Sequence, residues 1–259
     1  MESVADAVER LNLLAATPEL KLLAGLFSAA GHELSLVGGP VRDAFLGRPV
    51  TDLDLTTDAT PDETLAIVNP AADAVWEIGR EFGTIGARFG QHTVEITTYR
   101  SDAYESETRK PDVMFGDSLE ADLTRRDFTI NAMALRLPDA EGAQPRLIDP
   151  TGGVDDLLAR TLCTPSAPEV SFGDDPLRML RAARFAAQLG FTLEPAALAA
   201  AQGMADRLAI VSAERIGAEI GKLMLAADPV AGIRVLVDSG AADQVLPEIP
   251  ALRLEIDEH

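Results

Sequence analysis

The sequence predicts an α+β fold in which a mixed sheet flanked by helices is followed by a portion made of helices alone. Three observations lead to this class. An apolar run at residues 34–37 ends at a glycine pair and is followed by a short helical segment and a second apolar run. Between residues 74 and 100 apolar residues alternate with polar ones, as in strands with one buried face. Beyond residue 150 the spacing is helical throughout, which predicts one unit over residues 1–150 and another over 151–259.

Glycine and proline residues divide the first half of the chain into elements. Residues 4–30 are predicted as one helix, because leucines recur along one side and Gly31 follows. A second helix is expected from Val41 to Leu46. A third helix is expected to begin with Thr60 as its N-cap and Pro61 at its first position. Strands are expected at Ala74 to Ile78, Thr84 to Phe89 and Thr93 to Arg100, with a hairpin turn at Gly90-Gln91-His92 between the last two.

The remainder begins with a polar segment and then becomes helical. Residues 101–116 are predicted as a loop, and Ser118 begins a short helix by side-chain capping. The last strand ends at residue 150, and Thr151-Gly152-Gly153 is expected to be a hinge. Helices are predicted at Asp155 to Arg160, Pro176 to Leu189, Pro195 to Leu208, Ala213 to Ala226 and Pro229 to Ser239.

Composition limits the classes of protein to consider. The 259 residues are 47% hydrophobic, enough for a sizeable core. No apolar run approaches the ~20 residues that cross a bilayer, and the first residues lack the basic region of a signal peptide, so we expect a cytoplasmic protein without a membrane partner. One cysteine, Cys163, excludes an internal disulfide and a zinc site with several cysteines.

The net charge of −20 argues against nucleic-acid binding, because affinity for phosphate backbones comes largely from clustered Lys and Arg. Two features weaken this argument. Bound metal would neutralise some of the acids. The arginines are also concentrated locally, at Arg125-Arg126 and at Arg178, Arg181 and Arg184. Net charge therefore describes solubility better than it describes a site.

Two aspartates begin the second apolar run. Asp52 and Asp54 alternate with leucines, so on a strand both carboxylates project to the same face. Hard oxygen ligands in this arrangement suit Mg²⁺, which takes one or two carboxylates and completes its shell with water and substrate phosphates. A lone Asp-x-Asp is more often a solvated strand end. Glu95 lies between two apolar residues, and it is either a third ligand or a solvent-facing residue.

A phosphate-binding turn is predicted just before these aspartates. Gly38 and Gly39 let backbone N–H groups approach an anion, and Pro40 suits the first helical position. Arg42 on the first turn adds a charged fork for phosphate. A glycine pair alone is weak evidence for such a site, but residues 38–54 hold both the pair and the aspartates in a strand-turn-helix-strand context.

These residues resemble the head-domain signature of the class II tRNA nucleotidyltransferases, the CCA-adding enzymes, and of the related bacterial poly(A) polymerases. The resemblance implies a polymerase-beta-like nucleotidyltransferase head followed by a helical neck and the start of a body. Further blocks occur in the family's order across most of the chain. They are Arg125-Arg126-Asp127-Phe128-Thr129-Ile130-Asn131-Ala132, Asp149-Pro150-Thr151-Gly152-Gly153, Asp174-Asp175-Pro176-Leu177-Arg178, and Glu214-Arg215 through Lys222.

The resemblance also implies roles for individual residues. Asp52 and Asp54 correspond to carboxylates that bridge two Mg²⁺ ions, and Glu95 to a ligand of the ion at the attacking hydroxyl. Arg126, Asp127 and Asn131 correspond to residues that contact the sugar and phosphates of the incoming nucleotide, in addition to Gly38, Gly39 and Arg42 at the triphosphate.

A second constellation begins the helix after Pro176. Asp175 and Arg178 lie on one face, with Arg181 a turn further along. They form either an ion pair on a solvated face or a base reader. In a reader the arginine donates to the base, and the carboxylate accepts from the amino group that cytosine and adenine share. Similarity to the family favours base recognition by Asp175 and Arg178, and it implies that Arg181 helps to bind the triphosphate. Asp174 stands where the family usually has glutamate.

We therefore expect a Mg²⁺-dependent enzyme that adds CMP and AMP from CTP and ATP to the 3′ end of tRNA. A poly(A) polymerase that uses ATP alone is the alternative, and a non-catalytic RNA-binding module is a third. Protein partners are not indicated. Residues 247–259 include no convincing terminal element, so we expect the head and neck of a longer protein that by itself binds tRNA weakly.

Overall fold

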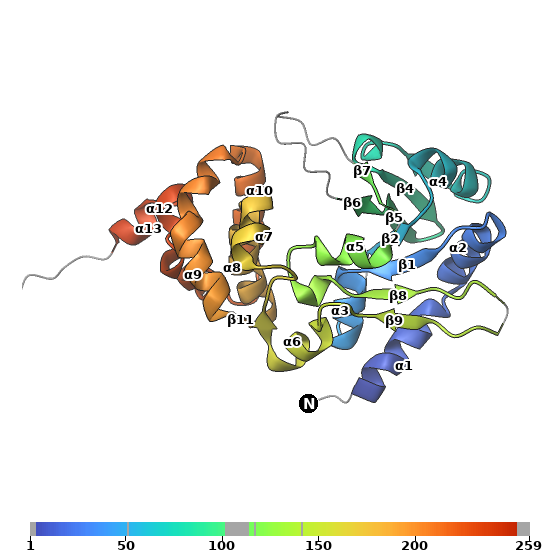
Figure 1. The fold of residues 1–259 in the computed structure, drawn as a ribbon, viewed down its shortest axis with the longest axis horizontal. Coiled ribbons are helices and arrows are strands. Elements are labelled where there is room, and N and C mark those ends of the chain that lie inside the picture. The colour runs from blue at the N-terminus through green and yellow to red at the C-terminus, as the bar shows by residue number, and fades with distance from the viewer. Residues whose placement is uncertain (1–3, 51, 102–113, 117, 141, 253–259) are drawn as a thin grey trace, which may run out of the picture. The chain divides into compact units, whose positions relative to one another are not determined.

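The structure, a computed structural model, describes residues 4–50, 52–101, 114–116, 118–140 and 142–252. The chain forms two compact units (Figure 1). The head unit comprises residues 1–126 and 130–153, and the helical unit comprises residues 127–129 and 154–259. Residues 127–129 thus belong to the helical unit although the strands on both sides of them in sequence belong to the head. No described helix is long and apolar enough to cross a membrane.

A seven-stranded mixed sheet forms the centre of the head unit, in the order β3-β4-β5-β2-β1-β8-β9. Its strands are β1 (Leu34–Val37), β2 (Leu53–Thr57), β3 (Ala74–Trp76), β4 (Thr84–Phe89), β5 (His92–Thr98), β8 (Ala134–Arg136) and β9 (Arg146–Ile148). The pairing of β2 with β5 is parallel, and the other neighbours in the sheet are antiparallel. Two short strands pair separately, β6 (Arg100–Ser101) and β7 (Met114–Phe115). Most of the predicted loop at 101–116 lies outside the described residues.

The helices of the head unit are α1 (Val4–Ala15), α2 (Pro18–Ala29), α3 (Gly39–Phe45), α4 (Pro61–Val68) and α5 (Leu119–Thr124), with the 3₁₀ turn η1 (Arg80–Phe82). A second 3₁₀ turn, η2 (Thr129–Asn131), begins at the last residue of the 127–129 segment and ends in the head unit. The prediction of one helix over residues 4–30 was wrong. Thr17 is extended and Pro18 begins a new helix, because the residue before a proline avoids the helical region. The predicted cap at Thr60 is confirmed, since Thr60 and Glu63 form a reciprocal capping box.

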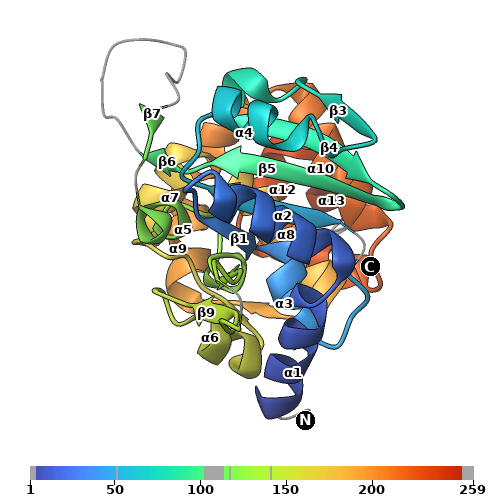
Figure 2. The same cartoon turned by 90° about the vertical axis from the view of Figure 1, so that its right-hand side faces the viewer.

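The two faces of the sheet differ in polarity around β2 and β5. Leu53 and Leu55 of β2 and Val94 and Ile96 of β5 are buried. Helices α2, α3 and α4 contact the strands of the sheet, and Figure 2 shows α2 on the viewer's side of it. Asp54 and Glu95 alternate with the buried residues and are exposed. The alternation therefore directs the acids away from the core and onto the polar face.

The helical unit is built around one long helix, α8. Its elements are α6 (Gly153–Ala159), α7 (Pro168–Asp174), α8 (Leu177–Leu189), α9 (Pro195–Met204), η3 (Ala205–Ile210), α10 (Ala213–Met224), α11 (Pro229–Asp238), α12 (Ala241–Val245) and α13 (Glu248–Ala251). Helices α7, α10 and α11 pack on α8, and strands β10 (Thr161–Leu162) and β11 (Thr192–Leu193) form a small parallel pair. The helix predicted to reach Leu208 ends at Met204 and continues as a 3₁₀ segment, and α7 was not predicted.

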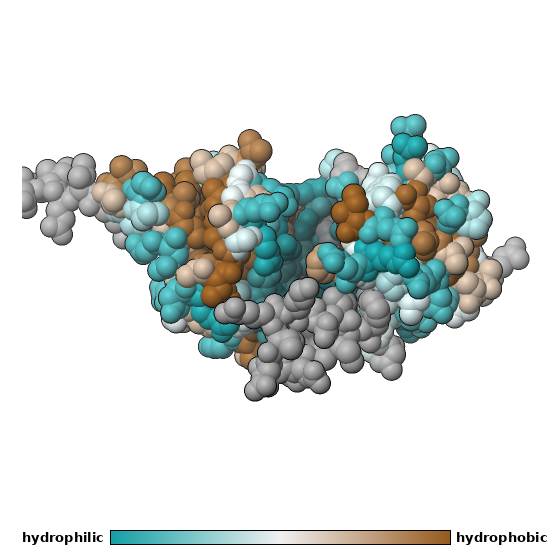
Figure 3. All heavy atoms as spheres, turned by 90° about the horizontal axis from the view of Figure 1, so that it is seen from above, coloured by the Kyte–Doolittle hydropathy of each residue, from teal (hydrophilic) through white to brown (hydrophobic). Residues whose placement is uncertain are grey.

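Apolar side chains also reach the surface of the helical unit (Figure 3). The large exposed ones are Leu158, Val170, Ile210, Met224, Leu225, Val230 and Leu252. Scattered exposed apolar residues are normal on folded proteins. The acidic composition therefore does not make every face of this unit polar.

The contact between α8 and α11 gives a test of the packing. A Cβ added at Gly232 would lie 2.7 Å from the carbonyl oxygen of Ala183 and 3.0 Å from side-chain atoms of Ala187 and Leu223. We expect Gly232→Ala to lower the free energy of unfolding by about 1–3 kcal/mol, the usual cost of overpacking, as measured by urea denaturation. Gly217→Ala on α10 is the matched control, because a Cβ there meets nothing within 4 Å and is expected to stabilise by about 0.4–1 kcal/mol. Equal stability of the two variants would contradict the close contact.

Candidate functional site

Two carboxylates lie side by side on the polar face of the head sheet. In the parallel register of β2 and β5, Asp54 is opposite Glu95. Partial burial raises the pKa of Asp54, the negative charges of Glu95 and Asp52 raise it further, and Arg126 and Arg42 act in the opposite direction. The three predicted carboxylates and two predicted arginines are therefore close enough for their charges to act on one another. A bound cation would relieve the repulsion that raises this pKa.

The donor set fits Mg²⁺ better than it fits a metal held by protein alone. Among the described residues, no three or more His, Cys, Asp or Glu side chains are arranged to hold a metal ion. Mg²⁺ does not require such a cage, because it is usually held by one or two carboxylates, water and substrate phosphates. Asp54 and Glu95 on neighbouring strands, with Asp52 close by, supply the oxygen ligands that such a site needs.

The predicted phosphate turn has the backbone that requires glycine. Gly38 has a φ of 72°, a region that residues with a Cβ rarely adopt. A Cβ at this position would lie 3.3 Å from Nη1 of Arg126, so the guanidinium lies directly beside the turn. The N–H of Gly38 donates to the carbonyl oxygen of Met133, 3.1 Å away. The turn is therefore held by backbone bonding and bordered by a cation.

Both arginines near the turn are held by acids or amides. Arg42 donates two bonds of 2.9 Å to the carboxylate of Asp43 and one of 2.7 Å to Oδ1 of Asn131. Arg126 donates to Asp122 at 3.0 Å. The carboxylate of Asp122 is 4% exposed and also accepts the N–H of Arg100. Each guanidinium thus has a fixed direction.

Two of these partners, Asp43 and Asp122, were not assigned a role from the sequence. A signal was available for Asp122, which precedes Arg126 by one helical turn, a spacing at which opposite charges pair. The pairing of Arg42 with the adjacent Asp43 had no such signal, because neighbouring residues on a helix do not face each other. We call Gly38, Gly39, Arg42, Asp52, Asp54, Glu95, Arg126 and Asn131 the head cluster.

The segment 127–129 places Asp127 in the helical unit, next to another predicted site residue. Arg181 of α8 donates from Nε to Oδ2 of Asp127 at 2.7 Å, and Nη2 lies 2.6 Å from the same oxygen. The rings of Phe128 and Phe185 meet edge to face, with centroids 5.8 Å apart. Thr129 donates to Asp156 at 2.6 Å. The segment is therefore tied to the helical unit by an ion pair, a ring contact and a hydrogen bond.

Asp175 and Arg178 are each held by other residues of the helical unit. Asp175 accepts the N–H of Leu177 at 3.1 Å, which caps the start of α8, and its second oxygen accepts a bond of 2.7 Å from Arg215. Arg178 donates to the hydroxyl of Ser171 at 2.8 Å. Burial lowers the pKa of Arg178, while the nearby Asp127 and Asp175 act in the opposite direction. Sequence reasoning noted the block containing Arg215 but did not connect it with Asp175.

Arg184, the third arginine of α8, points into the core. Its Nε donates to Glu219 of α10 at 2.6 Å, and its guanidinium lies over the ring of Phe185, 4.0 Å from the centroid. Both partners of the ion pair are nearly buried, at 10% and 6% side-chain exposure. Arg184 therefore links α8 to α10 and is not part of the candidate site.

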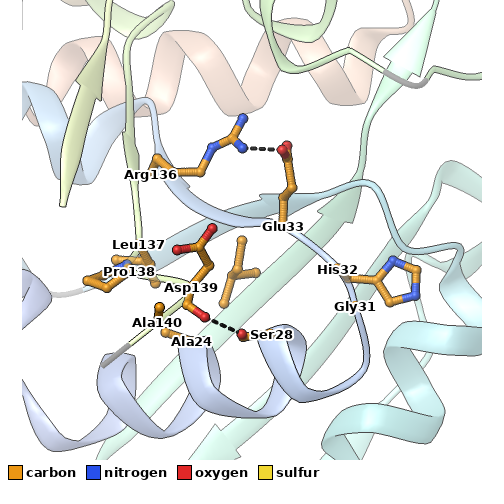
Figure 4. A pocket seen from close by; sticks show the side chains of 11 residues that line it. Ala24, Ser28, Gly31, His32, Glu33, Arg136, Leu137, Pro138, Asp139 and Ala140 are labelled. Atoms are coloured by element: carbon orange, nitrogen blue, oxygen red, sulfur yellow. Dashed lines mark hydrogen bonds and ion pairs between the residues drawn. The ribbon is translucent and has the colours of Figure 1, made fainter. Parts of the chain in front are cut away.

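A cavity of about 380 Å³ lies elsewhere in the head unit (Figure 4). It is bordered by the end of α2, the start of β1 and the segment after β8, and Glu33 in its wall pairs with Arg136. Leu34 lines the cavity and Gly38 follows the other end of β1, so the cavity and the phosphate turn are separated by the strand, roughly 13 Å. The cavity therefore does not belong to the head cluster.

Two family models match the chain. The model described as "Poly A polymerase head domain" matches residues 34–163, just over half of the sequence. The model described as "Probable RNA and SrmB- binding site of polymerase A" matches residues 190–252. The first match contains the whole head cluster, and the second lies within the helical unit.

Curated relatives and solved structures agree with these matches. The CCA-adding enzyme of Streptococcus gordonii is 41% identical over 231 residues, which cover 89% of this chain and 55% of that protein. The CCA-adding enzyme of Bacillus subtilis is 40% identical over 210 residues, 81% of this chain and 49% of that protein. The crystal structure of the Bacillus stearothermophilus CCA-adding enzyme in complex with CTP superposes with a TM-score of 0.78 at 32% identity, covering 92% of this chain and 57% of that one. The chain spans about half the length of the relatives that it matches.

The Asp127–Arg181 pair gives a test of the geometry within the helical unit. We expect a double-mutant cycle with Asp127→Asn and Arg181→Gln to yield a coupling energy of about 0.5–3 kcal/mol, because the two groups are in direct contact. Unfolding by urea supplies the four free energies. A parallel cycle with Asp127→Asn and Arg207→Gln is the control, and a coupling near zero for the first pair would show that the contact does not persist in solution.

Proposed function

This chain belongs to the family of the Poly A polymerase head domain, and from this premise we propose that it transfers CMP and AMP from CTP and ATP to the 3′ end of tRNA. The observation that carries the proposal is the head cluster, where two carboxylates in register lie near a glycine turn bordered by arginines. The names of the relatives support the substrate, since they are CCA-adding enzymes and one matching structure is a complex of such an enzyme with ATP.

Asp52, Asp54 and Glu95 would hold Mg²⁺ on the polar face of the sheet. When bound, a pair of such ions activates the attacking 3′-hydroxyl and stabilises the leaving pyrophosphate. Arg42 and Arg126 would contact the triphosphate, since guanidinium groups match phosphate oxygens and both are already directed by acids. Asn131, which accepts a bond from Arg42, would keep that side chain in place or contact the nucleotide.

The helical unit would select the base. Arg178 would donate to the base and Asp175 would accept from the amino group that cytosine and adenine share, whereas guanine and uracil present an oxygen there. Arg215 and the start of α8 hold the two oxygens of Asp175, so the carboxylate has a defined orientation. Arg181, paired with Asp127, would add positive charge for the triphosphate.

A poly(A) polymerase that uses ATP alone is a second candidate, favoured by the description of the matching head-domain model. Assays with tRNA lacking its terminal nucleotides, supplied with CTP alone or with ATP alone, distinguish the two. Incorporation of CMP would exclude the second candidate. Absence of any metal-dependent incorporation or nucleotide binding would favour a non-catalytic RNA-binding module.

The carboxylates give the first test of this function. We expect Asp54→Asn to reduce nucleotidyl transfer at least about 100-fold, because the loss of a metal ligand should exceed the loss caused by residues that only support one. Free energy of unfolding should not fall, since the amide has the same shape and the substitution removes the partly buried charge and the repulsion that raise the pKa of Asp54. Glu9→Gln on α1, an exposed acid, is the control and should retain full activity. Near-normal turnover of Asp54→Asn in Mg²⁺ would contradict the metal assignment.

Base selection gives the second test. We expect Asp175→Asn to weaken the binding of CTP and ATP by about 1–3 kcal/mol, because the amide replaces a hydrogen-bond acceptor with a donor. The affinities for UTP and GTP should therefore rise relative to those for CTP and ATP. The remaining amide oxygen can still cap α8, so the helix should persist. Equilibrium binding of the four nucleotides measures the effect without any RNA. Glu169→Gln on the neighbouring α7 is the control, and unchanged selectivity of Asp175→Asn would restrict Asp175 to capping.

A further inference from the structure

Trp76, the single tryptophan of the chain, lies in the same row of the sheet as the carboxylates. The row is defined by strand register. Trp76 of β3 is opposite Gly86 of β4, Gly86 is opposite Glu95 of β5, and Glu95 is opposite Asp54 of β2. Side chains of directly opposed residues point to the same face of a sheet. Trp76 therefore points to the polar face that carries the acids.

The indole extends from the edge strand toward the carboxylates. A Cβ added at Gly86 would lie 1.9 Å from Nε1 of Trp76 and 2.2 Å from Cε2. The five-membered ring thus occupies the space above Gly86, where any other residue would place its side chain. Since strands lie about 4.8 Å apart, the ring covers the position next to Glu95 in the row.

Exposed apolar side chains and an arginine lie near Trp76 in sequence or in strand register, together with the exposed acids Glu77 and Glu81. The large aromatic side chain of Trp76 is partly exposed to solvent. Ile78 and Phe82, just beyond β3, are 88% and 50% exposed. Arg88 is exposed and lies two residues beyond Gly86 on the same strand, hence on the same face. We call Trp76, Ile78, Phe82 and Arg88 the edge patch.

We propose that Trp76 stacks on a nucleobase near the 3′ end of the single-stranded acceptor RNA whose terminal hydroxyl reacts at the head cluster. This inference rests on the proposed function and extends it to the acceptor. Aromatic side chains beside basic ones are the usual means of holding single-stranded RNA, because every base has a stacking face and every backbone a negative charge. The row places such a platform two strands from Glu95 and three from Asp54, about 10 and 14 Å at the usual strand spacing.

The acceptor fits the edge patch better than the incoming nucleotide does. The proposed readers of the incoming base, Asp175 and Arg178, lie in the helical unit, and they recognise hydrogen-bonding groups. The edge patch offers an aromatic surface for stacking but no comparable set of hydrogen-bonding groups. It therefore suits a base that is bound without recognition of its identity. A purely structural role for Trp76, covering Gly86, is the competing explanation.

The fluorescence of Trp76 tests the proposal in the unmodified protein. Because the chain has one tryptophan, its emission reports on this position alone. The probe is a short single-stranded RNA with a free 3′-hydroxyl, titrated in the presence of Mg²⁺, with CTP as a separate titrant. We expect saturable quenching by the RNA and little change with CTP. Quenching by CTP alone, or no response to RNA, would overturn the proposal.

Variants provide a second measurement. Trp76→Ala should raise the KM for the RNA acceptor roughly 5- to 150-fold, the range for loss of one stacked base, with the KM for CTP unchanged. Trp76→Phe should restore most of the affinity. Leu13→Ala, at a residue on α1 that is 65% exposed, is the control for loss of an apolar surface group. An acceptor KM for Trp76→Ala equal to that of the parent would leave Trp76 as a cover for Gly86.

The two measurements separate failure of this inference from failure of the proposed function. Nucleotidyl transfer without RNA-dependent quenching would reject the stacking role and keep the function. Saturable quenching in a protein that transfers no nucleotide under any condition would keep the RNA platform and reject the function.

Discussion

In the head unit, β2 and β5 run parallel in a register that sets Asp54 opposite Glu95, and the buried residues beside each acid maintain that register. A slip of β2 by one residue would turn Leu53 and Leu55 toward solvent and Asp54 toward the core. The hydrophobic pattern therefore fixes the carboxylates more firmly than any contact of their own. Partial burial of Asp54 raises its pKa most, and the negative charge of Glu95 raises it further, so the shift is a consequence of that packing.

The arginines near the candidate site are directed by acids in the same way in both units. Arg42 pairs with Asp43 and Arg126 with Asp122 in the head, and Arg181 pairs with Asp127 in the helical unit. Ion pairs of this kind add little net stability, because desolvation offsets much of the attraction. What they supply is direction, since a guanidinium held on one side presents its remaining donors on the other. This arrangement places oriented guanidinium donors where phosphate would bind, in a chain whose net charge is −20.

The local signals in the sequence were reliable wherever the physical cause was itself local. The cap at Thr60, the strand at Thr84–Phe89 and the glycine turn after β1 each follow from the conformational limits of a few residues. The helix predicted over residues 4–30 failed because the leucine pattern was given more weight than Pro18. Helix α7 was missed because a segment of seven residues has too few turns to show a clear period.

By itself, the sequence determined that carboxylates, a glycine turn and arginines belong to one strand-turn-helix-strand region, because alternation and turn chemistry act over neighbouring residues. The tertiary structure decided which of these groups meet. Register between β2, β5, β4 and β3 depends on packing between distant segments, so the position of Trp76 over Gly86 was not visible in the sequence. The proximity of Asp54 and Glu95 was expected only through the family resemblance, and their register came from the structure. The assignment of Asp127 to the helical unit, through Arg181 and the ring contact of Phe128 with Phe185, likewise depends on contacts that no local pattern encodes.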